Sequence, residues 1–167
     1  MTPTVHVAAL WGSGHRAFQR ARAEAYLADE LCLSRVARLC VRCASPGHGR
    51  PVPLGASDAV HLSLAYAEDV VLVAWSSAPV GVDVERDAPG RGAGDYGDLR
   101  VWTRIEAIVK TSGEGLSREP VDLPELWTSP LPLPEGWVGT VACAVPAELS
   151  WRSGHPAHRG GPAAPPR

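Results

Sequence analysis

The chain has 167 residues, of which 45% are apolar and 20% charged, and its formal charge at pH 7 is −2. This length accommodates a single domain or two small lobes, and the composition is that of a globular protein with a useful core. A net charge so close to zero supplies no basic field, so we expect no nucleic-acid partner.

The first sixteen residues lack the basic start and the long apolar run of a signal peptide. The longest apolar stretch, residues 70–75, is far too short to cross a membrane. We therefore expect a cytoplasmic protein without a membrane partner.

The first predicted elements are a helix and a hairpin. Residues 18–36 carry Ala, Leu and Arg at helical spacing without Gly or Pro, and Arg16, Arg20 and Arg22 mark the polar face of this helix. Residues 46–51 are rich in Gly and Pro and predict a loop. Two apolar runs, 60–64 and 70–75, predict a β-hairpin.

The middle of the chain predicts a strand, a connection and a second helix. Residues 80–84 alternate apolar residues with Gly81 and Asp83, which is typical of a strand. Residues 87–97 are rich in Gly, Asp and Pro and indicate a flexible connection. Residues 99–111 have helical periodicity, and Gly113 and Gly115 end that helix.

Two further strands, 126–133 and 136–145, are predicted around a Pro-Glu-Gly turn. The composition from Ser153 onwards cannot form a core, so we assign residues 151–167 to a disordered tail. The order of elements predicts an α+β fold, with an N-terminal lobe at 1–79 and a C-terminal lobe at 80–150.

Four ionisable residues in the second half form the most informative pattern. In a strand of period two, Asp83 and Glu85 lie on the same face. Glu106 and Lys110 are four residues apart and share one face of the second helix. Lys110 is the only lysine, beside fifteen arginines. Carboxylates suit Mg²⁺, and an ammonium group suits the phosphates that Mg²⁺ commonly accompanies.

The same residues also have an ordinary structural interpretation. Asp83 and Glu85 could form the solvent face of an edge strand, and Glu106 and Lys110 an ordinary salt bridge within a helix, worth about 0.2–0.5 kcal/mol. The pattern alone leaves both interpretations open.

The cysteines leave a second question open. In a cytosolic protein Cys32, Cys40, Cys43 and Cys143 stay reduced. Cys40 and Cys43 have the spacing of two zinc ligands, with Cys32 or His48 as a further candidate, but a second Cys or His pair is missing. The alternative is a tight turn that contains small, half-buried thiols.

Longer motifs surround the four ionisable residues. The segment 81–85 reads GVDVE, and residues 102–116 read WTRIEAIVKTSGEGL. Together they resemble the two signature motifs of the 4′-phosphopantetheinyl transferases of the surfactin-synthetase-activating type, whose second motif runs W-x-x-K-E-A, a lysine, and G-x-G-L. The residues that match this second motif are Trp102, Glu106, Ala107, Lys110, Gly113, Gly115 and Leu116.

Three further segments resemble the same family, so that the likeness covers roughly residues 16–145. Residues 49–51 are similar to its G-K/R-P motif and residues 63–67 to its S-x-S-H-S/A motif. Residues 133–139 are similar to its C-terminal hairpin.

The resemblance implies a Mg²⁺-dependent transferase. Such an enzyme transfers phosphopantetheine from coenzyme A to a serine of an acyl or peptidyl carrier protein and releases adenosine 3′,5′-bisphosphate. It also implies a monomer of two pseudo-symmetric lobes, each a small antiparallel sheet packed with a long helix. The carrier stays open, although the broad-substrate type and a composition typical of a high-GC genome favour natural-product biosynthesis.

Roles follow from the resemblance position by position. Asp83, Glu85 and Glu106 would bind the metal, Glu106 would act as the base toward the carrier serine, and Lys110 would contact the reacting phosphate. The nucleotide phosphates would be held by Arg50 and Tyr66 and by helix arginines, of which Arg20 and Arg22 are the best candidates. For the helix arginines, a solvated polar face is the alternative.

Three positions depart from the family pattern. Ile105 replaces the lysine that precedes the glutamate, Tyr66 and Ala65 replace histidine and serine, and only sixteen residues separate Glu85 from Trp102. Two alternatives to an active transferase therefore remain: a degenerate relative that binds coenzyme A or a carrier with little turnover, and a zinc-binding interaction module built on Cys40 and Cys43.

Overall fold

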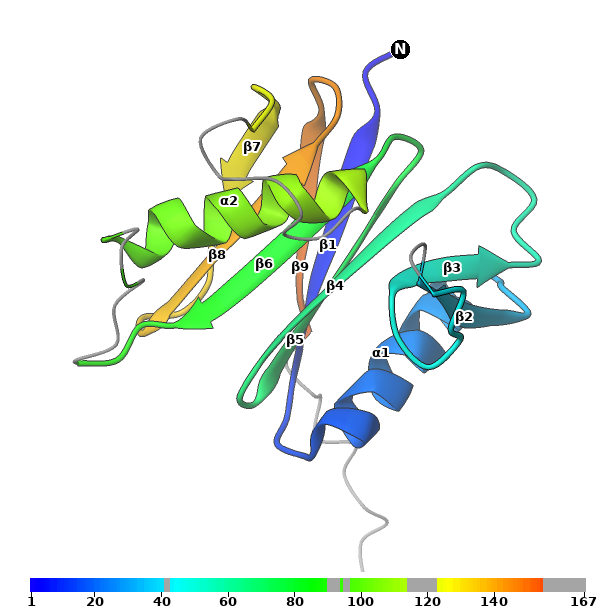
Figure 1. The fold of residues 1–167 in the computed structure, drawn as a ribbon, viewed down its shortest axis with the longest axis horizontal. Coiled ribbons are helices and arrows are strands. Elements are labelled where there is room, and N and C mark those ends of the chain that lie inside the picture. The colour runs from blue at the N-terminus through cyan, green and yellow to red at the C-terminus, as the bar shows by residue number, and fades with distance from the viewer. Residues whose placement is uncertain (41–42, 90–93, 95–96, 114–122, 155–167) are drawn as a thin grey trace, which may run out of the picture.

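A computed structural model describes residues 1–40, 43–89, 94, 97–113 and 123–154. Within these residues the chain forms two helices and nine strands (Figure 1). Their bounds, in chain order, are β1 Thr4–Trp11, α1 Arg16–Glu30, β2 Arg35–Leu39, β3 Arg50–Leu54, β4 His61–Ala67, β5 Val70–Ser76, β6 Val80–Arg86, α2 Leu99–Ser112, β7 Trp127–Pro130, β8 Trp137–Cys143 and β9 Glu148–Gly154.

The strands form three small sheets, and the predicted mixture of helices and small, largely antiparallel sheets is confirmed. One sheet has the order β4-β5-β1-β9, the second is the β2–β3 hairpin, and the third has the order β6-β8-β7. Every strand pair is antiparallel except β1 and β9, which run parallel. No helix in the described part of the chain is long and apolar enough to cross a membrane.

The helices and the two larger sheets form four layers, in the order α1, four-stranded sheet, three-stranded sheet, α2. Side chains that alternate along the strands pack against the layers on both sides. In β5, Val70, Leu72 and Ala74 face the other sheet, whereas the residues between them face α1. The strand is buried on both sides, which explains its continuous apolar sequence. In β6, the valines face the core, so the intervening residues face α2.

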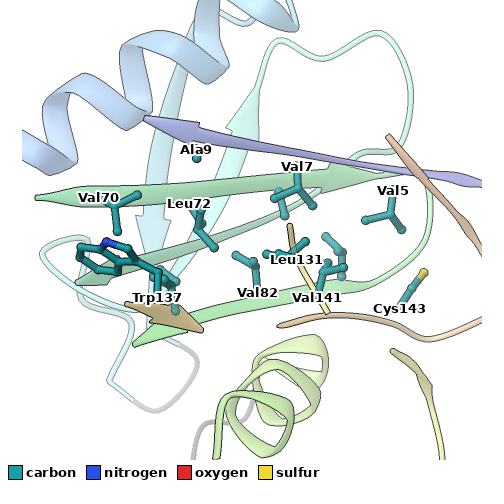
Figure 2. Packing of buried hydrophobic residues seen from close by; sticks show 14 residues of the cluster. Val5, Val7, Ala9, Val70, Leu72, Val82, Leu131, Trp137, Val141 and Cys143 are labelled. Atoms are coloured by element: carbon teal, nitrogen blue, oxygen red, sulfur yellow. The ribbon is translucent and has the colours of Figure 1, made fainter. Parts of the chain in front are cut away.

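The main core lies between the two larger sheets. Figure 2 shows Val7 and Leu72 from the four-stranded sheet opposite Val82 and Val141 from the three-stranded sheet, with no charged side chain among the residues drawn. All four side chains are fully buried. Burial of each contributes about 1.5–3 kcal/mol, so this cluster holds the two sheets together.

The helix predicted over 18–36 is shorter than expected. It ends at Glu30 in a Schellman-type turn, in which the Leu33 amide donates to the Ala28 carbonyl at 2.8 Å. Cys32 takes the left-handed position of this turn, with φ of 50°, where glycine is usual. Because neither Gly nor Pro marks this end of the helix, the sequence pattern predicted that the helix continues to residue 36, which lies in the strand β2.

The ends of the chain also differ from the prediction. The strand β1 was not predicted, although it is the central strand on which both β5 and β9 pair. The strand β9 continues to Gly154, so the prediction that the tail begins at residue 151 is wrong for 151–154. Because β9 joins the sheet of the N-terminal half, the two larger sheets do not divide at one point in the sequence. Residues 155–167 lie outside the described residues.

The loop predicted over 46–51 is wrong for Arg50 and Pro51, which begin the unpredicted strand β3. The other predicted elements are confirmed. The hairpin of β4 and β5, the strand β6, the helix α2 and the β7–β8 pair all form where the patterns indicated. Gly113 ends α2 in the left-handed conformation, with φ of 76°. Gly115 and six residues of the predicted connection 87–97 (90–93 and 95–96) lie outside the described residues.

Candidate functional site

The helix α2 lies unusually close to the strand β6, and Gly81 makes this approach possible. A methyl group at Gly81 would stand 1.9 Å from the Ala107 carbonyl oxygen of α2. The helix is also held to β8, where the hydroxyl groups of Thr103 and Thr140 form a buried hydrogen bond of 2.9 Å. The face of β6 that carries Asp83 is therefore brought directly against α2.

Asp83 and Lys110 form an ion pair between these two elements. The ammonium Nζ of Lys110 lies 2.6 Å from Oδ1 of Asp83 and donates to the Val82 carbonyl oxygen at 3.3 Å. Asp83 is only 6% exposed. Its second carboxylate oxygen, Oδ2, is buried and has no hydrogen-bond partner among the residues that the structure describes. An unsatisfied buried oxygen costs free energy and is a natural ligand position for a cation.

The surroundings raise the pKa of Asp83 to about 6. Burial is the main cause, because it disfavours the charged carboxylate. Lys110 opposes this shift through its charge and its hydrogen bond, whereas Glu106 and Glu85 add to it by repulsion. Asp83 is thus a carboxylate that a cation would stabilise in its ionised form.

Glu106 and Glu85 join the same electrostatic group. Both side chains are half-buried. Burial raises the pKa of Glu106, the charge of Lys110 lowers it, and the charge of Glu85 raises it. The structure therefore brings the three predicted acids and the predicted lysine together. However, the three carboxylates do not each place an oxygen atom within 4.8 Å of the other two. Among the described residues, Cys40, Cys43 and His48 are the only group of three possible metal ligands that meets this distance.

The donor set nevertheless fits Mg²⁺. Three carboxylates offer only oxygen ligands, which is the preference of this cation, and Asp83 Oδ2 is buried without a partner in the described part of the chain. Lys110 occupies the other oxygen of Asp83 and supplies a positive charge at the same place.

A cleft of about 250 Å³ adjoins this acidic group and contains Lys110 in its wall. Arg50 of β3 and Arg38 of β2 contribute the other positive charges. Both sequence halves thus line it; the lining residues are Arg38, Gly49, Arg50, Pro51, Leu62, Ser63, Leu64, Lys110 and Gly113.

Arg50 is the predicted phosphate ligand that lies in this cleft. Burial lowers the pKa of Arg50. The described residues offer its guanidinium one neutral partner, the imidazole Nδ1 of His61 at 3.4 Å, and no carboxylate within salt-bridge distance. Burial, and next the charge of Arg50, lower the pKa of His61, which favours the neutral acceptor form. The Arg50 charge therefore stays available for an anion.

Tyr66, the second predicted phosphate ligand, lies among arginines. Its hydroxyl accepts a hydrogen bond of 3.0 Å from Arg38, and the Arg16 guanidinium lies 3.8 Å from the ring centroid. Burial is the main cause that lowers the pKa of Arg16, and the charges of Arg20 and Arg38 lower it further. One acidic side chain, Glu24, lies 3.0 Å from Arg38 Nε. The group around Tyr66 therefore carries excess positive charge.

The two helix arginines chosen from the sequence have different surroundings. Arg22 donates to the backbone carbonyl groups of Leu10, Trp11 and Gly12, so its guanidinium holds the turn after β1. Arg20 donates to the Gly47 carbonyl oxygen at 3.1 Å. Arg20 thus holds the loop that leads to the cleft residue Gly49, whereas Arg22 holds the turn after β1.

Arg38 is a cleft residue that the sequence reasoning missed. It lies on β2, which the pattern had partly assigned to the first helix, so its place beside Arg50 was hidden. The pairing of β2 with β3 is the signal that could have found it, because it sets Arg38 opposite Pro51, which also lines the cleft.

Ile105, which departs from the family pattern, does not line the cleft with Lys110. It lies in a separate hollow of about 320 Å³ on α2, together with Val101 and Arg104. Its place in this hollow means that its apolar side chain does not border the cationic cleft.

No protein-family model and no curated protein matches this chain.

Proposed function

We propose that this protein is a phosphopantetheinyl transferase that moves the 4′-phosphopantetheine group of coenzyme A to a serine of an acyl or peptidyl carrier protein. One observation carries the proposal: Lys110 pairs with the buried Asp83 and also lines the cleft that contains Arg38 and Arg50. A carboxylate group for a cation and an arginine-lined cleft for phosphates thus meet at one side chain. The motif resemblance supports the same reaction.

Asp83, Glu85 and Glu106 would hold Mg²⁺. The bound cation would neutralise charge on the pyrophosphate of coenzyme A and stabilise the departing phosphate. Arg50 and Lys110 supply the remaining positive charge in a partly buried cleft, where electrostatic attraction is stronger than in water.

Glu106 is the proposed base. Its partial burial raises its pKa, which makes the carboxylate a better proton acceptor. The carrier serine gives its hydroxyl proton to Glu106, and the serine oxygen bonds to the phosphorus that carries the pantetheine group. The bond from this phosphorus to the bridging oxygen breaks, and adenosine 3′,5′-bisphosphate leaves with that oxygen.

The arginines around Tyr66 are the proposed site of the 3′-phosphate. Arg16, Arg20 and Arg38 carry more positive charge than Glu24 neutralises. Arginine binds phosphate through two parallel hydrogen bonds. We further propose a monomer of two pseudo-symmetric lobes, with the substrate in the cleft that both halves of the sequence line.

The test is direct. The full chain is incubated with coenzyme A, Mg²⁺ and an apo carrier protein, and the carrier is weighed by mass spectrometry. Transfer adds about 340 Da to the carrier. An unchanged mass with fatty-acid, polyketide and peptide carriers, while the protein stays folded, contradicts the proposal.

A second candidate is a relative that binds coenzyme A with little turnover. It is favoured by the separation of the three carboxylates, which do not approach within 4.8 Å as a group. Calorimetry with coenzyme A and Mg²⁺ separates the two functions. Binding without any mass gain on the carriers supports the second candidate, and binding with transfer supports the first.

A further inference from the structure

The tip of the β2–β3 hairpin holds a cluster of metal-ligating side chains outside the proposed active site. One ligand atom from each of Cys40, Cys43 and His48 lies within 4.8 Å of the others. The sulfur of Cys43 is 3.4 Å from Nε2 of His48. Cys43 and His48 are exposed and Cys40 is half-buried, and none of the four cysteines forms a disulfide.

The backbone of the hairpin tip fixes the spacing of these side chains. The Ala44 amide donates to the Cys40 carbonyl oxygen at 2.8 Å, and the Cys40 amide donates to the Ser45 carbonyl oxygen at 3.1 Å. Ala44 has a left-handed backbone with φ of 54°. The pairing of Leu39 with Arg50 closes the base of the loop. These contacts hold Cys40 beside Ala44 and Ser45, and both thiols and the imidazole lie close together.

The distances suit a tetrahedral metal ion. With bonds of about 2.3 Å to sulfur and about 2.0 Å to nitrogen, ligands of zinc lie about 3.5–3.8 Å apart. The distance between Cys43 Sγ and His48 Nε2 is already close to this value. The two remaining separations, from Cys40 Sγ to the other two ligand atoms, are at most 4.8 Å, so Cys40 Sγ needs to move by no more than about 1 Å, within the reach of a side-chain rotation.

We propose that Cys40, Cys43 and His48 bind one Zn²⁺ ion, with solvent as its fourth ligand. Two thiolates and an imidazole are ligands that favour zinc over Mg²⁺ and Ca²⁺. The exposed side chains of Cys43 and His48 give the ion a path to the site. This site is independent of the proposed transferase function, which uses oxygen ligands on β6 and α2.

The bound ion would stabilise the loop between β2 and β3, which leads into the cleft. Gly49 and Arg50 follow His48 directly and line the cationic cleft. Arg20 holds the same loop through the Gly47 carbonyl oxygen. A ligand that binds the native state stabilises it, so zinc raises the melting temperature and protects the hairpin from proteolysis.

The experiment uses the full, reduced chain after removal of metals with a chelator. Co²⁺ is titrated while absorption is recorded, and Zn²⁺ is then added in competition. We expect one cobalt per chain with a thiolate-to-cobalt charge-transfer band, loss of the band when zinc displaces it, and one zinc per chain after dialysis. Cys43→Ser and His48→Gln each weaken zinc binding by at least tenfold.

Cys32→Ser is the matched control, because Cys32 is an exposed cysteine outside the cluster. It should bind zinc as the native chain does. The proposal is overturned if the folded native chain retains no zinc, if Cys43→Ser binds zinc as tightly as Cys32→Ser does, or if the cluster binds Cu⁺ but not Zn²⁺. Because none of these measurements uses coenzyme A, their failure leaves the transferase proposal standing.

Discussion

Replacement of Asp83 by asparagine should change how the stability of the protein depends on pH. The folded state holds the proton of Asp83 up to a pKa of about 6, against an ordinary value of 3.8. Between these values the folded state binds more protons than the unfolded state. Raising the pH therefore favours unfolding, and this contribution to stability is present below about pH 4 and lost as the pH rises through 6.

The size of the effect follows from the shift. A difference of about two pH units, at 1.36 kcal/mol for each, corresponds to about 3 kcal/mol at pH 7. Asp83 is almost fully buried, so solvent does not screen this cost. We compare the free energies of unfolding of the native chain and of Asp83→Asn. The native value minus the variant value should fall by about 3 kcal/mol as the pH rises from 3.5 to 7.

Urea denaturation followed by circular dichroism, in a chelating buffer at several pH values, measures this difference. Asp58→Asn removes an exposed carboxylate from the loop before β4 and controls for the loss of one negative charge. If the native chain and Asp83→Asn give parallel profiles from pH 3.5 to 7, the argument from burial is refuted.

The same two proteins test the metal proposal. A cation that binds Asp83 should stabilise the native chain at pH 7, by about 2.7 kcal/mol when its concentration is a hundred times its dissociation constant. Asp83→Asn should gain much less from Mg²⁺ and should lose transfer activity. Equal stabilisation of both proteins by Mg²⁺ would show that the cation binds elsewhere.

Three further changes test other parts of the site. Gly81→Ala places a methyl group 1.9 Å from a backbone oxygen of α2, so we expect a loss of about 3 kcal/mol and a melting temperature lower by roughly 6–12 °C; Gly47→Ala, whose nearest neighbour would lie at 3.5 Å, should melt within about 2 °C of the native chain. Lys110→Ala leaves the Asp83 carboxylate buried without its partner, so urea unfolding should show a loss of about 3 kcal/mol at pH 7 and a smaller loss at pH 5, where the carboxyl is protonated. Ile105→Lys should change the transfer rate by less than about threefold, because this position lies outside the cationic cleft, and a tenfold increase would contradict that placement.

The acidic half of the site was accessible from sequence because two local periodicities determine it. Period two in β6 places Asp83 and Glu85 on one face, and the i to i+4 spacing in α2 places Glu106 and Lys110 on one face. The sequence did not show that these faces meet so closely. That depends on Gly81, whose missing side chain lets the two backbones approach.

The parts that escaped prediction depend on contacts between distant segments. The strand β9 has a polar, mixed sequence and becomes a strand because it pairs with β1, more than 140 residues earlier. The first helix was drawn too long because Cys32, and not glycine, takes the left-handed turn. Arg38 was missed for the same reason, since it follows that turn and reaches the cleft only through the β2–β3 hairpin.

The cost of burying Asp83 is itself an argument for function. Asparagine would fill the same space on β6 without the charge that destabilises the fold at neutral pH, and a hydrophobic residue would suit the buried site better still. The chain instead keeps the carboxylate and sets its only lysine against Oδ1, while no described residue offers Oδ2 a partner. Buried acids with raised pKa values gather at active sites, because a bound cation or substrate recovers the free energy that burial cost. A cation bound at Oδ2 would recover this free energy beside the arginine-lined cleft, and under the proposed function the Mg²⁺ that accompanies the pyrophosphate would be that cation.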